Sequence, residues 1–374
     1  MQPLLDLLLR IAVFLAGGAL VVYTLLAAIR TFVLPRGDNV GLTRIVFRSV
    51  FSIFNIPGSK AKTYYERDRI MALFAPISLL VLPIVWLILI ALGYTLMYWA
   101  IGAGTFYEAF KISGSSLYTL GFFTVDTLGQ TGLNGLGATV LELSEATIGL
   151  GLVALLISYL PTMYSAFSKR ETLVTMLEVR ADSPPSPIVL ITRAHSIRGL
   201  SYLSELWQEW EVWFSEIDES HTSLGPINFF RSPQPDRSWI TAAGTVLDAA
   251  ALMSSVVNVP RTPEAQLCIR AGFVALRHIC DFFGIPYDPD PHFPDHPISI
   301  TRQEFDEACA ELSAAGVPLK EDRDQAWQDF AGWRVNYDTV LLELADLTMA
   351  PYAMWSSDRG VQDSRSARRK RRRF

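Results

Sequence analysis

The sequence predicts an all-α membrane protein with three transmembrane helices, a re-entrant loop between the second and third of them, and a cytoplasmic α-helical domain. The chain of 374 residues is 50% hydrophobic and only 18% charged, with a mean hydropathy of +0.27. This balance excludes a wholly soluble or disordered protein. Runs without Asp, Glu, Lys or Arg cover residues 11–29, 70–107 and 146–168. Because roughly 20 apolar residues cross a bilayer core as a helix, each run is long enough to span.

After the third run, charged residues recur at the density of a soluble protein, so the chain divides into a membrane half and a water-soluble half. The expected boundaries are 1–69 for the first span and a basic loop, 70–170 for the second span, the re-entrant loop and the third span, 171–187 for a linker, 188–355 for the cytoplasmic helical domain, and 356–374 for a basic tail.

The first run has the position and length of a cleavable signal peptide, which is the alternative to a permanent span. Asp6 precedes Arg10, no small-x-small cleavage site follows, and the strongest positive charge lies after the run. These features favour an uncleaved span. Gly17 and Gly18 within it favour close contact with a second helix.

Loop charges predict the orientation of the spans. Eight basic and three acidic residues lie between the first and second runs, whereas the segment between the second and third runs carries Lys111 against four acidic residues. Positive loops stay in the cytoplasm. The N-terminus is therefore expected outside the plasma membrane and the C-terminal domain inside the cell.

The outer segment contains a short uncharged stretch, residues 112–125, with the sequence ISGSSLYTLGFFTV between Lys111 and Asp126. Fourteen residues are too few to cross a bilayer and fit a re-entrant segment. Non-helical backbone at that depth must be buried in protein or line water, and Gly121 permits such a turn. Backbone carbonyls there can replace the water shell of an ion; they belong to Thr119, Leu120, Gly121 and Phe122. The alternative is a glycine-rich hairpin that merely joins two helices.

This stretch resembles the potassium-channel pore-loop family, in which a pore helix ending in Ser/Thr-rich residues precedes Thr-x-Gly-Tyr/Phe-Gly-Asp. The residues that follow the family pattern are Ser115, Ser116, Leu117, Tyr118, Thr119, Leu120, Gly121 and Phe122. The pattern then departs, because Phe123 stands in place of the second glycine and Thr124 in place of the acid. Phe123 favours negative φ, which leaves ion selectivity open.

The resemblance implies a homotetramer in the lipid bilayer, with K⁺ or another monovalent cation as the permeant ion and no cofactor. It assigns the ion-binding filter to Thr119, Leu120, Gly121 and Phe122, and the pore helix to Ser115, Ser116 and Tyr118. The third span, from about Leu143 to Ser168, would line the pore. A hinge or gate is expected at Gly149, Gly151 and Pro161, with ordinary helix packing as the alternative.

The soluble half reads as helices separated by proline-rich loops, starting after ADSPPSP at 181–187. Helices are expected near 195–219, 238–258, 263–283, 302–315 and 322–352. Thr301 and Glu304 form a predicted capping box. Large aromatic residues recur at helical spacing and are expected in the core: Trp207, Trp210, Trp213 and Phe214. The three cysteines, without a CxxC pair, are expected to be reduced.

Charge limits the partners of this half. Residues 169–364 carry 15 basic and 29 acidic side chains, which disfavours nucleic acid. Seven of the last ten residues are basic, so the tail is a weak candidate for anionic lipid. Asp288, Asp290 and His292 are weak metal candidates in a proline-rich loop, where an ordinary surface turn is the alternative.

We find no nucleophile elbow, P-loop, dinucleotide fingerprint or paired zinc ligands, so no enzymatic activity is expected. The sequence predicts a tetrameric pore-loop cation channel, potassium-type with an atypical filter, that is regulated by its cytoplasmic helical domain. Two alternatives remain open: a membrane-anchored cytoplasmic enzyme or sensor, and a non-conducting scaffold with a degenerate pore.

Overall fold

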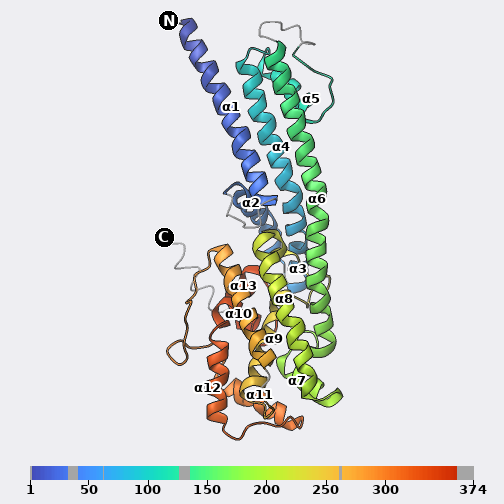
Figure 1. Cartoon of the computed structure of the whole chain (residues 1–374), viewed down its shortest axis with the longest axis vertical. Helices are drawn as coiled ribbons and strands as arrows, with labels where there is room; N and C mark the ends of the chain where they lie inside the picture. The colour runs from blue at the N-terminus through green and yellow to red at the C-terminus, as the bar shows by residue number, and fades with distance from the viewer. Residues whose placement is uncertain (1, 33–40, 62, 126–134, 261–262, 360–374) are drawn as a thin grey trace. The chain divides into compact units, whose positions relative to one another are not determined.

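The structure is a computed structural model that describes residues 2–32, 41–61, 63–125, 135–260 and 263–359. Within these ranges all regular elements are helices, which confirms the all-α prediction (Figure 1). The chain forms two compact units. Unit 1 comprises residues 1–56 and 73–164, and unit 2 comprises residues 57–72 and 165–374.

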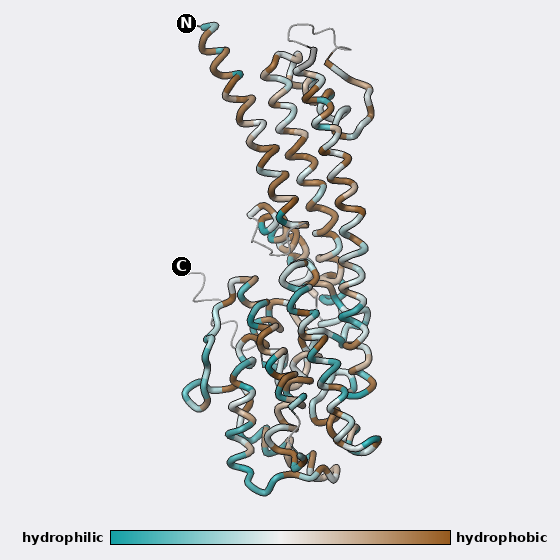
Figure 2. Tube along the Cα trace, in the orientation of Figure 1, coloured by the Kyte–Doolittle hydropathy of each residue, from teal (hydrophilic) through white to brown (hydrophobic). Residues whose placement is uncertain are grey.

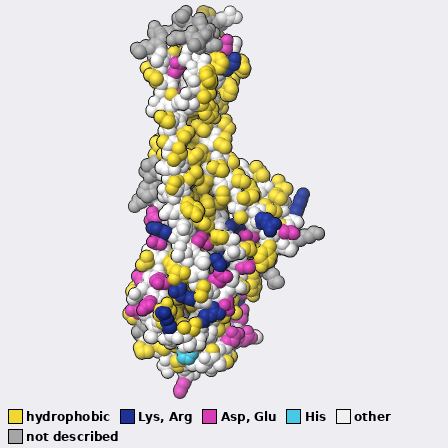
Figure 3. All heavy atoms as spheres, turned by 90° about the vertical axis from the view of Figure 1, so that its right-hand side faces the viewer, with side chains coloured by type: hydrophobic (Ala, Val, Ile, Leu, Met, Phe, Trp, Pro, Cys, Tyr) yellow, Lys and Arg dark blue, Asp and Glu magenta, His cyan; other side chains and the backbone are white. Residues whose placement is uncertain are grey.

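Unit 1 contains the apolar helices. They are α1 (Gln2–Phe32), α2 (Gly41–Gly58, up to Ile56), α4 (Phe74–Ala100), α5 (Phe106–Leu117) and the first part of α6 (Gly135–Ala181). Three helical stretches are long and apolar enough to cross a membrane, namely Gln2–Phe32, Tyr64–Ala100 and Gly137–Ala181. Figure 2 shows the hydrophobic residues along α1, α4 and α6, and Figure 3 shows one face of unit 1 covered by hydrophobic side chains. The chain is therefore a membrane protein by the length and composition of its helices.

The first two spans pack through glycine. A Cβ on Gly17 would lie 2.5 Å from the carbonyl oxygen of Gly93, and a Cβ on Gly93 would lie 2.7 Å from Val21. Small residues let two membrane helices approach this closely. The prediction for Gly17 is thus confirmed, whereas Gly18 has nothing within 4 Å of its Cβ position and makes no such contact.

Unit 2 is a bundle of shorter helices. It contains α3 (Tyr64–Ala72), the C-terminal part of α6, α7 (Pro187–Ile197), α8 (Leu203–Ser223), α9 (Trp239–Ser255), α10 (Pro263–Phe283), α11 (Arg302–Ala314), α12 (Arg323–Arg334) and α13 (Asp338–Thr348), with 3₁₀ turns at Leu200–Tyr202, Gly225–Phe229 and Ser357–Arg359. The expected helix 322–352 is two helices, and residues 171–181, expected in a linker, continue α6. The aromatic stripe of α8 is fully buried, as predicted.

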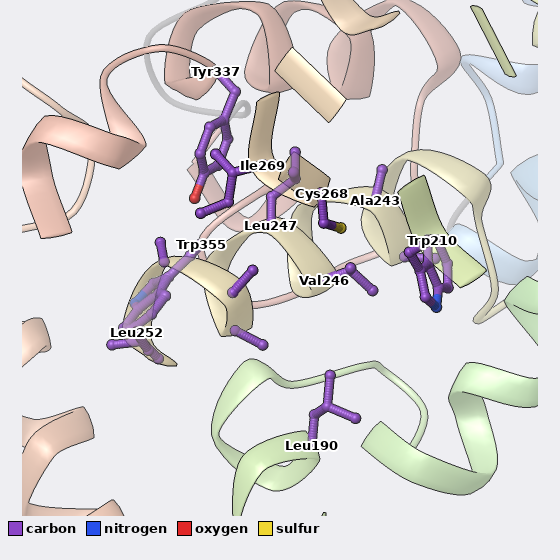
Figure 4. Close-up of a cluster of buried hydrophobic side chains, with 14 of the residues drawn as sticks. Leu190, Trp210, Ala243, Val246, Leu247, Leu252, Cys268, Ile269, Tyr337 and Trp355 are labelled. Atoms are coloured by element: carbon purple, nitrogen blue, oxygen red, sulfur yellow. The ribbon is translucent and has the colours of Figure 1, made fainter. Parts of the chain in front are cut away.

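The core of unit 2 is built around α9. Nearly every residue of this helix is buried, as expected for a helix that is apolar on all sides (Figure 4). Its one charged residue, Asp248, accepts two hydrogen bonds from Arg334 of α12, at 2.6 and 2.7 Å, and one from the Tyr337 hydroxyl at 2.9 Å. Burial raises the pKa of Asp248 to about 6, against the lowering effect of Arg334. Arg334 also donates to the Trp355 carbonyl and to Asp338, so one guanidinium joins α9, α12, α13 and the C-terminal segment.

The C-terminal end of α6 is part of the unit 2 core. Val174, Leu177 and Ala181 are buried, and Arg170 is 2% exposed. Arg170 donates to the carbonyls of Ile227 and Phe230, each at 2.8 Å. An arginine so enclosed fixes the C-terminal part of α6 within unit 2, because loss of any of these acceptors would leave part of a buried charge unpaired.

The predicted capping box of α11 is confirmed and gives unit 2 an acid-sensitive contact. Glu304 accepts from the Thr301 amide at 2.8 Å and from Arg359 at 2.5 Å. Burial acts to raise the pKa of Glu304, but the bonds from Arg359 and Thr301 outweigh it and lower this pKa to about 2. The unfolded chain has a glutamate pKa of about 4.3. The contribution of the ionised Glu304 to the stability of the folded state is therefore complete above about pH 4.3 and is lost as the pH falls toward 2.

We expect Arg359→Ala to raise the pKa of Glu304 and to reduce stability at neutral pH more than near about pH 1, where Glu304 is protonated in both proteins. Chemical denaturation of the parent and the variant across this pH range measures the difference. Equal losses of stability at both ends of the range would contradict the role assigned to this pair.

Candidate functional site

The strongest candidate site is the segment after α5. The capping box of Thr105 and Glu108 starts α5, with Glu108 Oε2 accepting from the Thr105 amide at 2.7 Å. The helix ends at Leu117 after three turns. Thr119 and Gly121 then have positive φ, at 54° and 70°, whereas the intervening Leu120 does not. Alternation of left- and right-handed φ turns successive peptide groups so that their like ends point to one side.

The amide groups of this segment point back toward the helix end. Thr119 donates to the Ser116 carbonyl at 2.9 Å and Leu120 to the Ser115 carbonyl at 2.8 Å. The Phe123 amide donates to the Ser115 hydroxyl at 3.0 Å. Three amides of the segment, those of Thr119, Leu120 and Phe123, are thus occupied by acceptors near the end of α5. Within the described residues, no donor bonds the carbonyl oxygens of Thr119, Leu120, Gly121 and Phe122.

The half-helix α5 packs against α4 and α6. The Ser113 hydroxyl lies 3.0 Å from the Ala91 carbonyl, nine residues before the end of α4, which corresponds to about 14 Å along that helix. At its C-terminal end, Leu117 meets Gly149, where a Cβ would lie only 2.0 Å from the Leu117 carbonyl oxygen. Gly149 lies about 21 Å along α6 from its start at Gly135. The end of α5 therefore lies well inside the lengths of both neighbouring helices.

A buried carboxyl group connects these three helices. Glu145 of α6 has no exposed surface, and its Oε1 accepts a 2.6 Å hydrogen bond from the Ser113 hydroxyl of α5. Tyr98 of α4 places a buried hydroxyl beside the carboxyl group. The second oxygen, Oε2, has no well-aligned donor among the described residues. An ionisable residue inside a membrane span is costly and is commonly functional.

In the sequence, Glu145 is one of the four acidic residues between the second and third apolar runs, which predict the orientation of the spans. Glu145 lies ten residues after the start of α6, directly before the uncharged run 146–168. An acidic residue at the edge of a predicted span is the sequence signal that indicates a functional role. Its partners could not be found from the sequence because Tyr98 and Ser113 are separated from it by 47 and 32 residues.

The C-terminal end of the segment is held by a second acid, Glu142. The Val125 amide donates to Glu142 Oε1 at 2.8 Å, which ties the segment to α6 one turn before Glu145. Lys111 lies over the Phe123 ring at 5.1 Å. A positive charge therefore lies close to Phe123, the residue that follows the predicted filter residue Phe122. Asp126, the first acid after the expected filter, lies outside the described residues.

Large apolar side chains of the segment are exposed in the described part of the chain. Phe122 is 71% exposed and Leu120 53%, and the predicted pore-helix residue Tyr118 is also exposed. Ser115 is buried, and Ser116 accepts the Thr119 amide. These exposed apolar side chains are a candidate interaction surface.

The other predicted site residues are placed as follows. Gly151 has nothing within 4 Å of its Cβ position, in contrast to Gly149. Pro161 lies inside α6, which continues as a helix to Ala181. Proline supplies no amide to the preceding turn, so this is a weak point of the helix. The hinge prediction for Gly149, Gly151 and Pro161 remains a prediction.

The candidate metal ligands Asp288, Asp290 and His292 lie in two exposed Asp–His pairs. Asp288 Oδ2 lies 2.9 Å from His296 Nε2, and Asp290 Oδ1 lies 3.9 Å from His292 Nε2. Among the described residues no group of three or more His, Cys, Asp or Glu side chains is arranged to hold a metal ion. The three cysteines are buried and unpaired. The basic tail lies outside the described residues.

Comparison with models of protein families, with curated proteins and with solved structures gives no match, so the local geometry of the segment after α5 is the basis for assigning a function.

Proposed function

We propose that the chain forms a cation channel, with potassium as the ion, in which α5 and the segment after it enter the membrane from the outer side. The observation that carries the proposal is the alternation of φ at Thr119 and Gly121 beside four carbonyl oxygens that accept no hydrogen bond from the described residues. Bare carbonyls are the groups that replace an ion's water in a selectivity filter. Backbone of this kind is tolerated at membrane depth where it lines water.

A single segment provides only one wall of a conduction path, so the proposal requires a ring of copies. The exposure of Phe122 and Leu120 supports it, because a neighbouring chain can cover these side chains while the carbonyls face a central axis. Four copies follow from the resemblance to the potassium-channel pore-loop family. Native mass measurement of the detergent-solubilised protein tests this, and a monomeric protein would exclude the proposed conduction path.

Regulation by unit 2 is proposed to act through α6. This helix is continuous from Gly135 to Ala181, and its last turns are embedded in the unit 2 core through Arg170, Val174 and Leu177. A change in unit 2 would therefore be delivered to the helix that contacts α5 at Gly149.

Gly121→Ala is expected to lower potassium conduction about 5- to 30-fold. The cause is backbone strain, because φ is 70° at this position and an L-residue pays roughly 1–2 kcal/mol there, while nothing lies within 4 Å of the added Cβ. Potassium flux from vesicles that contain the purified protein measures the change. Gly114→Ala is the matched control, since that glycine lies in α5 with equally open surroundings and without positive φ. Equal flux from Gly121→Ala and Gly114→Ala would contradict the filter assignment.

Glu145 is expected to act as a positioning residue for α5. Glu145→Ala removes the 2.6 Å acceptor of the Ser113 hydroxyl, which keeps only the Ala91 carbonyl at 3.0 Å, and it opens a cavity between the helices. We expect a loss of about 1–3 kcal/mol of stability and a loss of flux. Glu145→Gln keeps an acceptor for Ser113 and is expected to retain flux and thermal stability. If the glutamine variant loses flux as fully as the alanine variant while remaining folded, the carboxylate charge, and not the hydrogen bond, is required.

A further inference from the structure

The helix α2 has an apolar face and an arginine edge that the described residues of unit 1 leave exposed. Ile45, Ile53 and Ile56 are 62%, 64% and 61% exposed. Arg44 and Arg48 are also exposed. A group of exposed isoleucines on one helix indicates a contact with another protein or with a membrane. The contacts of α2 within unit 1 distinguish between these two.

Contacts within unit 1 place α2 beside the ends of two membrane spans. The Thr43 hydroxyl lies 2.9 Å from that of Thr31, in the last turn of α1. Rings of α2 pack around Phe74, the first residue of α4, with centroid distances of 5.5–6.4 Å; they belong to Phe47, Phe51 and Phe54. One side of α2 is thus fixed to the point where α1 ends and α4 begins.

The remaining surface of α2 is divided into two strips. At about 100° per residue, Ile45 and Ile56 lie within about 20° of each other, and Ile53 lies next to them. Arg44 and Arg48 lie within about 40° of each other on the edge between this face and the side that holds Phe74. The helix carries no acidic residue. A wide apolar face beside a narrow basic edge is the pattern of a helix that lies in a membrane interface.

We propose that α2 is an interfacial helix that binds an anionic lipid surface in the leaflet at the end of α1. Ile45, Ile53 and Ile56 enter the acyl boundary, in continuity with the lipid-facing sides of α1 and α4. Arg44 and Arg48 pair with phosphate groups of anionic headgroups, each favouring them about fivefold over zwitterionic ones. The proposal does not depend on ion conduction.

Site-directed spin labelling of the full chain in vesicles of phosphatidylcholine and phosphatidylglycerol tests the location of the apolar face. Labels are attached to Ile53→Cys and, as matched control, to Asn55→Cys on the arginine edge; both positions are exposed, whereas the native cysteines are buried. We expect collisions with oxygen and protection from a water-soluble nickel chelate at 53, and the reverse at 55. Equal access of the chelate to both labels would place α2 in water and overturn the proposal. Protection from both reagents at 53 would mean that protein, such as a second copy, covers the face, and would also overturn it.

The arginine assignment is tested with spin-labelled lipids. The parent is expected to immobilise phosphatidylglycerol in preference to phosphatidylcholine, and the double variant Arg44→Gln, Arg48→Gln is expected to lose that preference by an order of magnitude or more, as about fivefold for each arginine implies. Arg10→Gln is the control, because Arg10 lies near the start of α1 and pairs with Asp6 at 3.1 Å. An unchanged preference in the double variant would overturn the lipid assignment.

Discussion

Replacing Gly149 by alanine is expected to abolish potassium flux and to destabilise the helical bundle of unit 1. The added Cβ would lie 2.0 Å from the carbonyl oxygen of Leu117 and 3.0 Å from its carbon, and both atoms are backbone. No rotamer change relieves such a clash, so α5 and α6 must separate by an ångström or more. Overpacking of this kind costs about 1–3 kcal/mol. The displaced atoms belong to Leu117, the last residue of α5, two residues before Thr119.

The chain supplies a matched control for this variant. Gly151 lies two residues further along α6 and has nothing within 4 Å of its Cβ position. Gly151→Ala is expected to leave flux unchanged and to be neutral or stabilising by about 0.5–1 kcal/mol, because alanine is the better helix former. The two substitutions are chemically identical, so a shared loss of flux would show that the contact between Leu117 and Gly149 is not the cause.

Arg334→Ala is expected to have the largest effect on the stability of unit 2. The side chains of Arg334 and Asp248 have no exposed surface, and removing the guanidinium leaves the Asp248 carboxylate buried without its partner. Breaking a buried pair in this way costs about 3–5 kcal/mol. Removal also takes a donor from the Trp355 carbonyl, so the C-terminal segment should loosen first. Thermal unfolding and amide hydrogen exchange measure the two effects.

Asp248→Asn together with Arg334→Met distinguishes the loss of the whole ion pair from the cost of leaving one buried charge without its partner. The double variant removes both charges, keeps a hydrogen-bonding group for Tyr337, and is expected to recover much of the stability lost in Arg334→Ala. Arg302→Ala is the surface control, because its pair with Asp324 is exposed and should contribute no more than about 1 kcal/mol. A loss from Arg302→Ala as large as that from Arg334→Ala would contradict the importance given to burial.

The sequence predicts best the features that depend on local patterns. The three apolar runs predict α1, α4 and α6, the spacing of Trp207, Trp210 and Trp213 predicts a buried face, and the pair of Thr301 and Glu304 predicts the start of α11. Each of these signals lies within a few helical turns, where periodicity and capping chemistry act.

The features that the sequence did not reveal depend on distant partners. Arg334 and Asp248 are separated by 86 residues, and nothing in either local sequence identifies the other as a partner. The sequence predicts a basic loop where α2 lies, because Arg44 and Arg48 dominate the charge of this segment. Its contacts with Phe74 come from another helix and have no local signal. The break at Leu73 between α3 and α4 was hidden in a continuous apolar run.

Ion-substitution recording of the purified full chain in planar bilayers tests the central claim most directly. The account predicts a cation current carried by potassium in the parent protein, a current reduced about 5- to 30-fold in Gly121→Ala, and no current in Gly149→Ala. A parent protein that is assembled and folded in the bilayer, yet passes no cation current at any voltage or pH, would contradict the account.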